Sequence, residues 1–241
     1  MISCVIPMYN EESIAESSMR ELCAAMEKSF ADEGWEVVVS NDGSADRTKE
    51  IISALSQEID DLRLTSYDDN RGKGSAIREG ILASRGDVVI YTDCDLAYGT
   101  DILRVMVDKL KSDGSDVVIG SRNLSPEGYA SYTPLRRLAS KTYIKVISFA
   151  AGFKHSDSQC GIKCFKGEAA RRIFSTCRIN SFAFDLEALM TAEAMGYKVT
   201  EQAVTIINHR ESTSKVHLFR DTLKMLRDIR KIKKRLKATK F

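Results

Sequence analysis

Apolar and polar residues follow one another in regular blocks along the first 120 positions of the chain. Short apolar runs predict strands at 3–7, 36–40, 62–67 and 116–120, and in the run that begins at Val88. The segments between these runs carry apolar residues about four positions apart, as in Leu22, Met26 and Phe30, and predict helices. This alternation indicates an α/β fold with a mostly parallel central sheet and helices on both faces.

The second half of the chain shows the same two patterns at longer intervals. We expect helices at 131–152, 185–196 and 218–241, a strand or hairpin at 157–165 and a strand at 199–207. The last helix differs in charge from the rest, because residues 217–241 contain ten Lys or Arg and two Asp. We therefore divide the chain into a body at 1–216 and a basic amphipathic C-terminal helix at 217–241.

The composition fits a single folded body. The chain has 241 residues, of which 43% are hydrophobic, enough for a sizeable core. It contains no uncharged apolar stretch of about 18 residues. The segment 1–7 has no basic residues before its apolar run and therefore predicts a first strand, not a secretion signal. The six cysteines lack zinc-finger spacing. We therefore interpret them as free thiols, as expected for a protein of the reducing cytosol.

Four polar clusters directly follow predicted strands. They lie at 9–11, 41–44, 71–74 and 93–95. In open α/β sheets, ligands bind outside the carboxyl ends of the strands. One acidic turn would be ordinary, but four polar clusters along the same edge predict a ligand site.

The last of these clusters carries two carboxylates, Asp93 and Asp95. Because side chains alternate along a strand, both are expected to leave its end on the same side. Two carboxylates that share a direction repel each other unless a cation lies between them, and oxygen ligands suit Mg²⁺ or Mn²⁺. A polar turn explains the local pattern equally well, because Asp is common in turns.

The cluster at 71–74 combines Arg71 and Lys73 with two glycines ahead of a predicted helix, an arrangement that suits a phosphate. It does not match the GxxxxGK[ST] loop, and no GxGxxG follows the first strand, which disfavours an ATPase or an NAD enzyme. A divalent ion between carboxylates, with cations nearby, suits a diphosphate whose charge must be neutralised as it leaves.

These motifs, in their order and spacing, resemble those of glycosyltransferase family 2. The resemblance rests on the segments 5–12, 41–48, 71–76 and 93–95. Two later segments, 157–165 and 182–187, are similar to those of the dolichyl-phosphate and polyprenyl-phosphate glucosyltransferases and mannosyltransferases. The match covers residues 2–215, and it implies a GT-A (Rossmann-like) fold and an inverting transfer from a nucleotide sugar.

The resemblance also implies roles for individual residues. The implied nucleotide-binding residues are Pro7, Tyr9, Glu11, Asp42, Lys73 and Asp93, with Tyr9 against the base and Asp42 at its edge. Asp93 and Asp95 match the metal-binding DxD motif, for which Mg²⁺ or Mn²⁺ is the implied cofactor. Two positions depart from the pattern: Asn41 stands where Asp is common, and Ala97 stands where some mannosyltransferases have a polar ligand.

The resemblance places the acceptor in the second half of the chain. The implied acceptor or phosphate ligands are Arg122, Gln159, Lys163, Arg210 and Lys215. Asp185 joins Asp93 and Asp95 as an implied catalytic residue, either as a ligand of a sugar hydroxyl or as a general base. Its position in the first turn of a predicted helix also has a structural explanation. An acceptor phosphate, already ionised at neutral pH, needs no strong base.

The implied activity is that of a metal-dependent hexosyltransferase. It would move a hexose, with glucose favoured, from UDP-glucose to a polyprenyl or dolichyl phosphate. One alternative is a family 2 transferase acting on a glycan hydroxyl, which would need Asp185 as a base. Another is a sugar-nucleotide-binding protein without turnover.

The C-terminal helix is expected to lie on a membrane. Its apolar residues recur three or four positions apart with Lys and Arg on the other faces, as at the surface of an anionic bilayer. The body offers no basic face with stacking aromatics, so we do not expect a nucleic acid partner. We predict a cytoplasmic enzyme, peripherally attached to the cytoplasmic face of a membrane. Relatives often continue into transmembrane helices here, so the chain is either a peripheral enzyme or part of a longer one. A homo-oligomer is left open.

Overall fold

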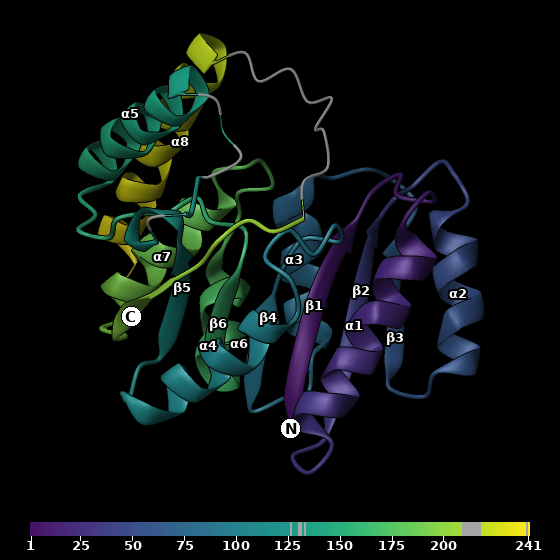
Figure 1. Cartoon of the computed structure of the whole chain (residues 1–241). Coiled ribbons are helices and arrows are strands. Elements are labelled where there is room, and N and C mark those ends of the chain that lie inside the picture. Colours follow the sequence, from purple (N-terminus) through teal and green to yellow (C-terminus); the bar gives the residue numbers. More distant parts are fainter. Residues whose placement is uncertain (126, 130–131, 133, 209–217, 240) are drawn as a thin grey trace.

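A computed structural model describes residues 1–125, 127–129, 132, 134–208, 218–239 and 241 (Figure 1). The strands are β1 (Ile2–Met8), β2 (Trp35–Asp42), β3 (Leu62–Tyr67), β4 (Val88–Tyr91), β5 (Val117–Ser121), β6 (Lys163–Lys166) and β7 (Val199–Ala203). The α-helices are α1 (Ala15–Phe30), α2 (Thr48–Glu58), α3 (Lys73–Ala83), α4 (Asp101–Ser112), α5 (Pro134–Ala151), α6 (Gly167–Thr176), α7 (Phe184–Ala194) and α8 (Leu218–Ala238).

The strands form one sheet in the order β3-β2-β1-β4-β6-β5-β7. All neighbouring strands are parallel except β6, which runs antiparallel to both β4 and β5. The predicted α/β fold with a mostly parallel sheet is therefore confirmed. The reversed direction of β6 matters for the site, because it brings the start of β6 to the carboxyl end of β4, where Lys163 pairs with Tyr91.

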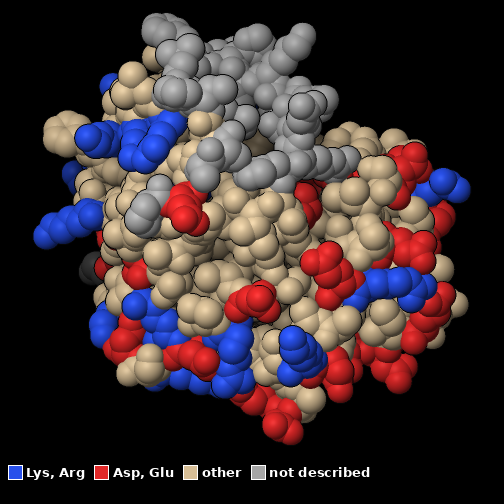
Figure 2. Space-filling view, in the orientation of Figure 1, with Lys and Arg blue, Asp and Glu red and all other residues tan. Residues whose placement is uncertain are grey.

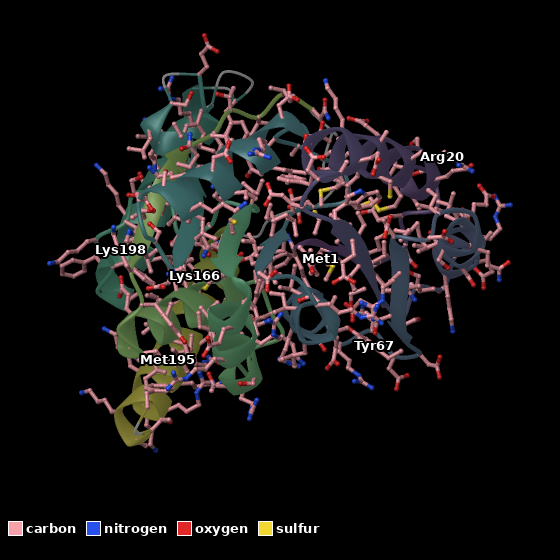
Figure 3. The ribbon with its side chains drawn as sticks, turned by 90° about the horizontal axis from the view of Figure 1, so that it is seen from below. Met1, Arg20, Tyr67, Lys166, Met195 and Lys198 are labelled. Atoms are coloured by element: carbon pink, nitrogen blue, oxygen red, sulfur yellow. The ribbon has the colours of Figure 1, made fainter. Side chains whose placement is uncertain are left out.

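Helices cover both faces of the sheet. One apolar core lies between the sheet and α1, α2 and α4, and a second lies between the other face and α3, α5, α6, α7 and α8. Seen from below, Arg20 of α1 lies on one side of the sheet and Met195, which follows α7, lies on the other (Figure 3). Neighbouring residues of one strand, such as Val88 and Val89, enter opposite cores. This explains why the strands appear in the sequence as continuous apolar runs.

The second half differs in detail from the sequence prediction. The strand or hairpin expected at 157–165 is the short strand β6, and the strand expected at 199–207 ends at Ala203. Helix α6 was not predicted. Its apolar residues, such as Ile173 and Phe174, pack into the second core, and Gly167 begins it directly after β6.

Helix α8 does not stand apart from the body. Its apolar side chains Met225, Ile229 and Ile232 are buried in the second core, and the helix packs against α5 and α7. The sequence boundary between 216 and 217 falls among residues outside the described part of the chain. None of the helices described is long and apolar enough to cross a bilayer.

Candidate active site

The polar clusters that follow β1, β2 and β4 lie at the edge of the sheet where these parallel strands end, at the top of Figure 1. Because β6 is antiparallel, the residues before it reach the same edge. The polar clusters after β1, β2 and β4 and the segment before β6 therefore meet, although they are far apart in the sequence.

Asp93 and Lys73 are in direct contact at this edge. Lys73 is the first residue of α3, and its Nζ forms an ion pair with Oδ1 of Asp93. Burial lowers the pKa of Lys73, whereas the carboxylates of Asp93, Asp185 and Asp95 raise it, and the net result is a raised pKa. Lys73 is therefore a cation placed among three acidic side chains.

Asp95 lies in a tight turn that follows β4. The strand ends at Tyr91, so Asp93 and Asp95 do not leave it as alternating strand residues, as the sequence suggested. Leu96 N donates to the Asp93 carbonyl (3.1 Å), and Leu96 has the left-handed φ of 48°. Ala97 N donates to Asp95 Oδ1 (3.2 Å). Burial and the charge of Asp93 raise the pKa of Asp95. The left-handed φ of Leu96 is strained for a non-glycine residue, and backbone strain of this kind is often found at functional sites.

The donor set at this turn fits a hard divalent cation only in part. Asp93 and Asp95 supply carboxylate oxygens of the kind that Mg²⁺ and Mn²⁺ take. The like-charge repulsion that raises the pKa of Asp95 would be relieved by a cation between them. Within the described ranges, no group of three or more His, Cys, Asp or Glu side chains could hold a metal ion. The remaining ligands would have to come from a bound diphosphate and water.

Asp42 is buried and fully engaged with the chain itself. Its carboxylate accepts hydrogen bonds from Tyr67 Oη (2.5 Å), Asn70 Nδ2 (3.1 Å), Arg71 N (2.8 Å) and Gly72 N (2.9 Å). Burial and the hydrogen bond to Asp42 raise the pKa of Tyr67. Asp42 thus fixes the 70–72 turn that leads to Lys73. Its implied role at the edge of a base stays a prediction.

The turns after β1 and β2 are tied to each other. Ala45 N donates to Asn10 Oδ1 (2.9 Å), Glu11 N donates to Thr48 Oγ1 (2.8 Å), and Glu12 N donates to an Asp46 oxygen (3.0 Å). Neighbouring residues include two of the implied nucleotide ligands. Tyr9 is 47% exposed, as a platform for a base would be, and Pro7 is partly buried. Glu11 lies near enough to Asp95 to raise its pKa.

Asp185 belongs to a buried ionic cluster. Its Oδ1 accepts hydrogen bonds from Lys163 Nζ (2.6 Å) and from Tyr91 Oη (2.5 Å). Lys163 is fully buried and also donates to the Cys160 carbonyl (2.7 Å). Burial and the carboxylate of Asp185 raise the pKa of Tyr91, which keeps its proton. The structure thus gives Lys163 an internal partner, so its implied contact with an acceptor phosphate stays a prediction.

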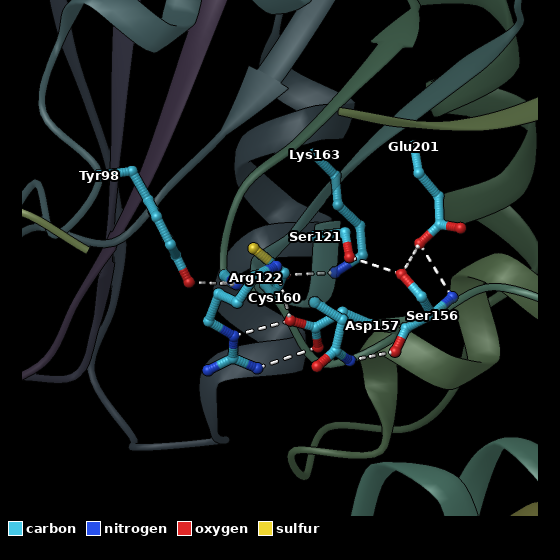
Figure 4. Close-up of polar contacts among 10 residues, drawn as sticks. Tyr98, Ser121, Arg122, Ser156, Asp157, Cys160, Lys163 and Glu201 are labelled. Atoms are coloured by element: carbon cyan, nitrogen blue, oxygen red, sulfur yellow. Dashed lines mark hydrogen bonds and ion pairs between the residues drawn. The ribbon is translucent and has the colours of Figure 1, made fainter. Parts of the chain in front are cut away.

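Arg122 is held by a second buried carboxylate, Asp157 (Figure 4). Arg122 Nε and Nη2 donate to the two oxygens of Asp157 at 2.7 and 2.9 Å, and Asp157 has no exposed surface. Burial lowers the pKa of Arg122, whereas the hydrogen bonds and charge of Asp157 raise it. The net result is a pKa well above the usual value for arginine. Beside this pair, the Ser156 hydroxyl donates to Glu201 (2.6 Å) and shares a hydrogen bond with the Ser121 hydroxyl (2.6 Å).

The other acceptor-side predictions meet the structure unevenly. Gln159 Nε2 is a buried atom without a hydrogen-bond partner in the described part of the chain, and its implied contact with an acceptor phosphate stays a prediction. Arg210 and Lys215 lie outside the described residues. Sequence reasoning assigned no role to Tyr91 or Asp157. Asp157 begins the segment 157–165, on which the family resemblance partly rests. An acidic residue in such a motif was the signal from which a role for Asp157 could have been predicted.

Comparison with known proteins gives this site a family context. A family model described as "Glycosyl transferase family 2" matches residues 3–174. The chain is 33% identical over 208 residues to a dolichyl-phosphate beta-glucosyltransferase of Trichomonas vaginalis, covering 83% of this chain and 62% of that protein. It is 32% identical over 224 residues to glycosyltransferase AglD of Haloferax volcanii, covering 93% and 35%. It is 33% identical over 218 residues to the human dolichyl-phosphate beta-glucosyltransferase, covering 84% and 66%. The chain thus spans between 35% and 66% of the length of these three relatives.

Solved structures share the fold. Glucosyl-3-phosphoglycerate synthase of Mycobacterium tuberculosis, in complex with Mn²⁺, UDP and glucosyl-3-phosphoglycerate, has a TM-score of 0.67 at 18% identity, covering 100% of this chain and 81% of that one. A mannosyltransferase of Pyrobaculum calidifontis, in complex with GDP-Man and Mn²⁺, has a TM-score of 0.60 at 19% identity, covering 92% and 60%. At such identities the likeness is one of fold, and it agrees with the GT-A fold expected from the sequence.

Proposed function

Because the chain belongs to glycosyl transferase family 2, we propose that it transfers glucose from UDP-glucose to a polyprenyl or dolichyl phosphate, with inversion at the anomeric carbon. The observation that carries the choice of substrates is the similarity, over more than four fifths of the chain, to proteins named dolichyl-phosphate beta-glucosyltransferases. The edge where Lys73, Asp93, Asp95 and Asp185 converge is the proposed place of reaction.

On the donor side, Asp93 and Asp95 would hold Mg²⁺ or Mn²⁺ beside the diphosphate. The bound ion would supply positive charge to the departing UDP. Lys73 lies against Asp93 and would reach the same phosphates, and the exposed ring of Tyr9 would stack on the base. The turn at 70–72, which Asp42 holds, keeps the amino end of α3 in place and with it Lys73.

On the acceptor side, a phosphate oxygen of the lipid would attack the anomeric carbon from the face opposite the diphosphate. The new bond joins that oxygen to the carbon as the bond to UDP breaks. No proton has to be removed, because the acceptor phosphate is already ionised at neutral pH. Arg122, which Asp157 orients, and Gln159, whose buried Nε2 has no hydrogen-bond partner among the described residues, are proposed to bind the acceptor phosphate.

Asp185 is proposed to position a sugar hydroxyl or the acceptor and not to act as a general base. Its Oδ1 already accepts from a buried ammonium and from a phenol. That oxygen is therefore already engaged by two donors of the chain itself. The glycan-hydroxyl alternative needs Asp185 as a base and is therefore less well supported.

We further propose that the enzyme binds the cytoplasmic face of a membrane through α5 and α8. The apolar residues Met225, Ile229 and Ile232 of α8 are buried in the second core. They are therefore not free to contact a membrane, as the sequence pattern of α8 alone suggested. Exposed apolar side chains remain on α5 at Leu138 (64%) and Phe149 (89%) and on α8 at Leu223 (54%). Lys and Arg side chains gather over these helices in the upper left of Figure 2. Each basic residue near an anionic surface contributes about 1 kcal/mol.

The test compares wild-type protein with Asp95→Asn in an assay with UDP-glucose, Mn²⁺ and polyprenyl phosphate. We expect a glucosylated lipid from the wild type and a loss of about 10²-fold or more in turnover from the variant. Asp32→Asn, an exposed residue in the turn before β2, should behave as wild type. Equal turnover by Asp95→Asn would refute the metal site. Transfer of glucose to a glycan hydroxyl in place of the lipid phosphate would refute the proposal that the acceptor is a polyprenyl or dolichyl phosphate.

A further inference from the structure

The buried glutamate at the start of α7, Glu187, joins three separate parts of the chain. It has no exposed surface. One oxygen is ion-paired with Arg235 of α8, and the other accepts from Arg178 N (2.9 Å) and Ile179 N (2.7 Å). A buried carboxylate is costly unless it is paired and hydrogen-bonded. Arg235 therefore supplies the charge that lets Glu187 hold the 178–179 backbone.

The segment that Glu187 holds packs against the residues on either side of Lys73. Gly74 N donates to the Asn180 carbonyl (3.0 Å), and Arg78 Nη1 donates to Asn180 Oδ1 (3.0 Å). A Cβ at Gly72 would lie 2.6 Å from the Asn180 carbonyl oxygen, and one at Gly74 would lie 2.5 Å from the Ile179 carbonyl oxygen. The two glycines, which the sequence suggested were there for close approach of a phosphate, are required here for close approach of the 179–180 backbone.

Lys73 stands between these two glycines, and its ammonium is paired with Asp93. A second contact from α8 reaches the same segment, because Ser181 Oγ donates to an oxygen of the buried Asp228 (3.2 Å). An unbroken series of contacts therefore runs from α8 through Glu187 and segment 178–181 to the 72–74 turn, and ends at the carboxylate pair.

We propose that Arg235 and Glu187 are positioning residues, through which the docked helix α8 sets the place of Lys73 at the diphosphate and metal site. The identity of that site rests on the proposed function, but the coupling between α8 and the 72–74 turn does not. Loss of the Arg235 charge should loosen segment 178–181, release the Gly74 amide and weaken the binding of nucleotide with metal.

The chain offers a matched control. Glu36 is also buried, is paired with an arginine (Arg63 Nη1, 2.6 Å) and accepts from a backbone amide (Arg85 N, 2.6 Å). It lies near the start of β2, at the opposite edge of the sheet from the carboxylate pair. Arg63→Met therefore removes the same kind of pairing as Arg235→Met. Arg63 meets α3 at its far end, where it also donates to the Ala83 carbonyl (3.1 Å), and makes none of the proposed series of contacts.

The experiment measures amide hydrogen exchange at Gly74 and the affinity for UDP in the presence of Mn²⁺ by calorimetry. In Arg235→Met we expect exchange at Gly74 to rise and UDP affinity to fall about tenfold, and in Arg63→Met we expect neither change. The conservative Arg235→Lys should restore most of both. If Arg235→Met does not fold, the double variant Glu187→Gln/Arg235→Met, which leaves no buried unpaired charge, takes its place and should show smaller changes of the same sign.

Unchanged Gly74 exchange in Arg235→Met, or the same change in Arg63→Met, overturns the proposal. Faster exchange at Gly74 with unchanged UDP affinity also overturns it, because the docked helix would then not act on the site. If the wild type binds no UDP with Mn²⁺, the proposed function fails, and the exchange at Gly74 still decides whether α8 controls the turn.

Discussion

Lys73 and Asp93 form an ion pair at the carboxyl edge of the sheet, where the ammonium occupies one of the two carboxylates expected to bind metal. If a divalent ion binds Asp93 as proposed, it competes with the Lys73 ammonium for that carboxylate, and a bound diphosphate would offer the ammonium other oxygens. The pair links the two halves of the proposed donor site.

Replacing Lys73 by Met should have opposite effects on metal and nucleotide. Without the competing ammonium, Mn²⁺ alone should bind up to about tenfold tighter, which corresponds to about 1.4 kcal/mol. UDP in the presence of Mn²⁺ should bind less tightly, because one phosphate partner is missing. Calorimetric titrations measure both affinities. Lys49→Met, an exposed lysine 3.8 Å from Asp68, is the control, and weaker Mn²⁺ binding in Lys73→Met would contradict the competition.

Replacing Lys163 by Met should destabilise the protein strongly. The change leaves the Asp185 carboxylate buried without its cation, which typically costs about 3–5 kcal/mol of unfolding free energy. The double variant with Asp185→Asn should recover much of that loss. Urea unfolding measures the difference, and Lys166→Met, which breaks a half-exposed pair with Asp116, should cost no more than about 1 kcal/mol. A similar cost for both lysines would argue against a buried pair.

Replacing Gly74 by Ala should lower the free energy of unfolding by about 2–3 kcal/mol, because the new methyl group meets the Ile179 carbonyl and Phe184 Cβ (2.6 Å). Gly114→Ala provides the comparison. Its site is open, so only the strain of a φ of +65° remains, about 1–2 kcal/mol. Thermal unfolding distinguishes the two, and a milder effect at Gly74 than at Gly114 would show that segment 179–180 yields easily.

The stability that Glu36 provides should depend on pH. Burial raises its pKa, while hydrogen bonds from Ser3 and Arg85 N and the pairing with Arg63 lower it, to a net value below the usual 4.5. A depressed pKa in the folded state means that the stabilisation is present above the unfolded pKa and is lost as pH falls through the folded pKa. The difference between wild type and Glu36→Gln, about 1–3 kcal/mol at pH 7, should therefore shrink below pH 4.5. Urea unfolding from pH 3 to 7 tests this, and a constant difference would contradict it.

Replacing Phe149 by Ser should weaken binding to anionic vesicles without changing the unfolding temperature, because its ring is 89% exposed. Flotation with vesicles of anionic phospholipid measures the effect, and binding should fall as salt is raised. Phe182→Ser is the comparison, because Phe182, before α7, is also a largely exposed aromatic residue (72%). Equal losses of vesicle binding in both variants would contradict a membrane contact through α5.

Much of the site could be predicted because its motifs are local. Asp93 and Asp95 follow directly on β4, and Lys73 opens α3, so each follows a strand whose apolar run is visible in the sequence. The two aspartates do not continue the alternation of the strand, as the sequence predicted, because β4 ends at Tyr91 and a turn begins there. A run of apolar residues indicates a strand but does not specify its last residue.

Other relationships depended on distant parts of the chain. The pairing of Lys163 with Asp185 follows from the antiparallel direction of β6, which no local pattern encodes. The apolar stripe of α8 is equally compatible with a membrane and with a protein core, and the structure buries it against α5 and α7. The glycines at 72 and 74 suit a phosphate or a neighbouring backbone, and the carbonyls of Ile179 and Asn180 take that place.

By itself, the sequence determined the α/β class, the order of the strands along the chain and the polar residues that end them, because these follow from periodicity and from neighbouring positions. The tertiary structure decided which charges are paired, which amphipathic face is covered and which glycine meets which backbone. Those outcomes depend on contacts between residues far apart in the chain, such as Glu187 with Arg235, and on the energy of burying them together.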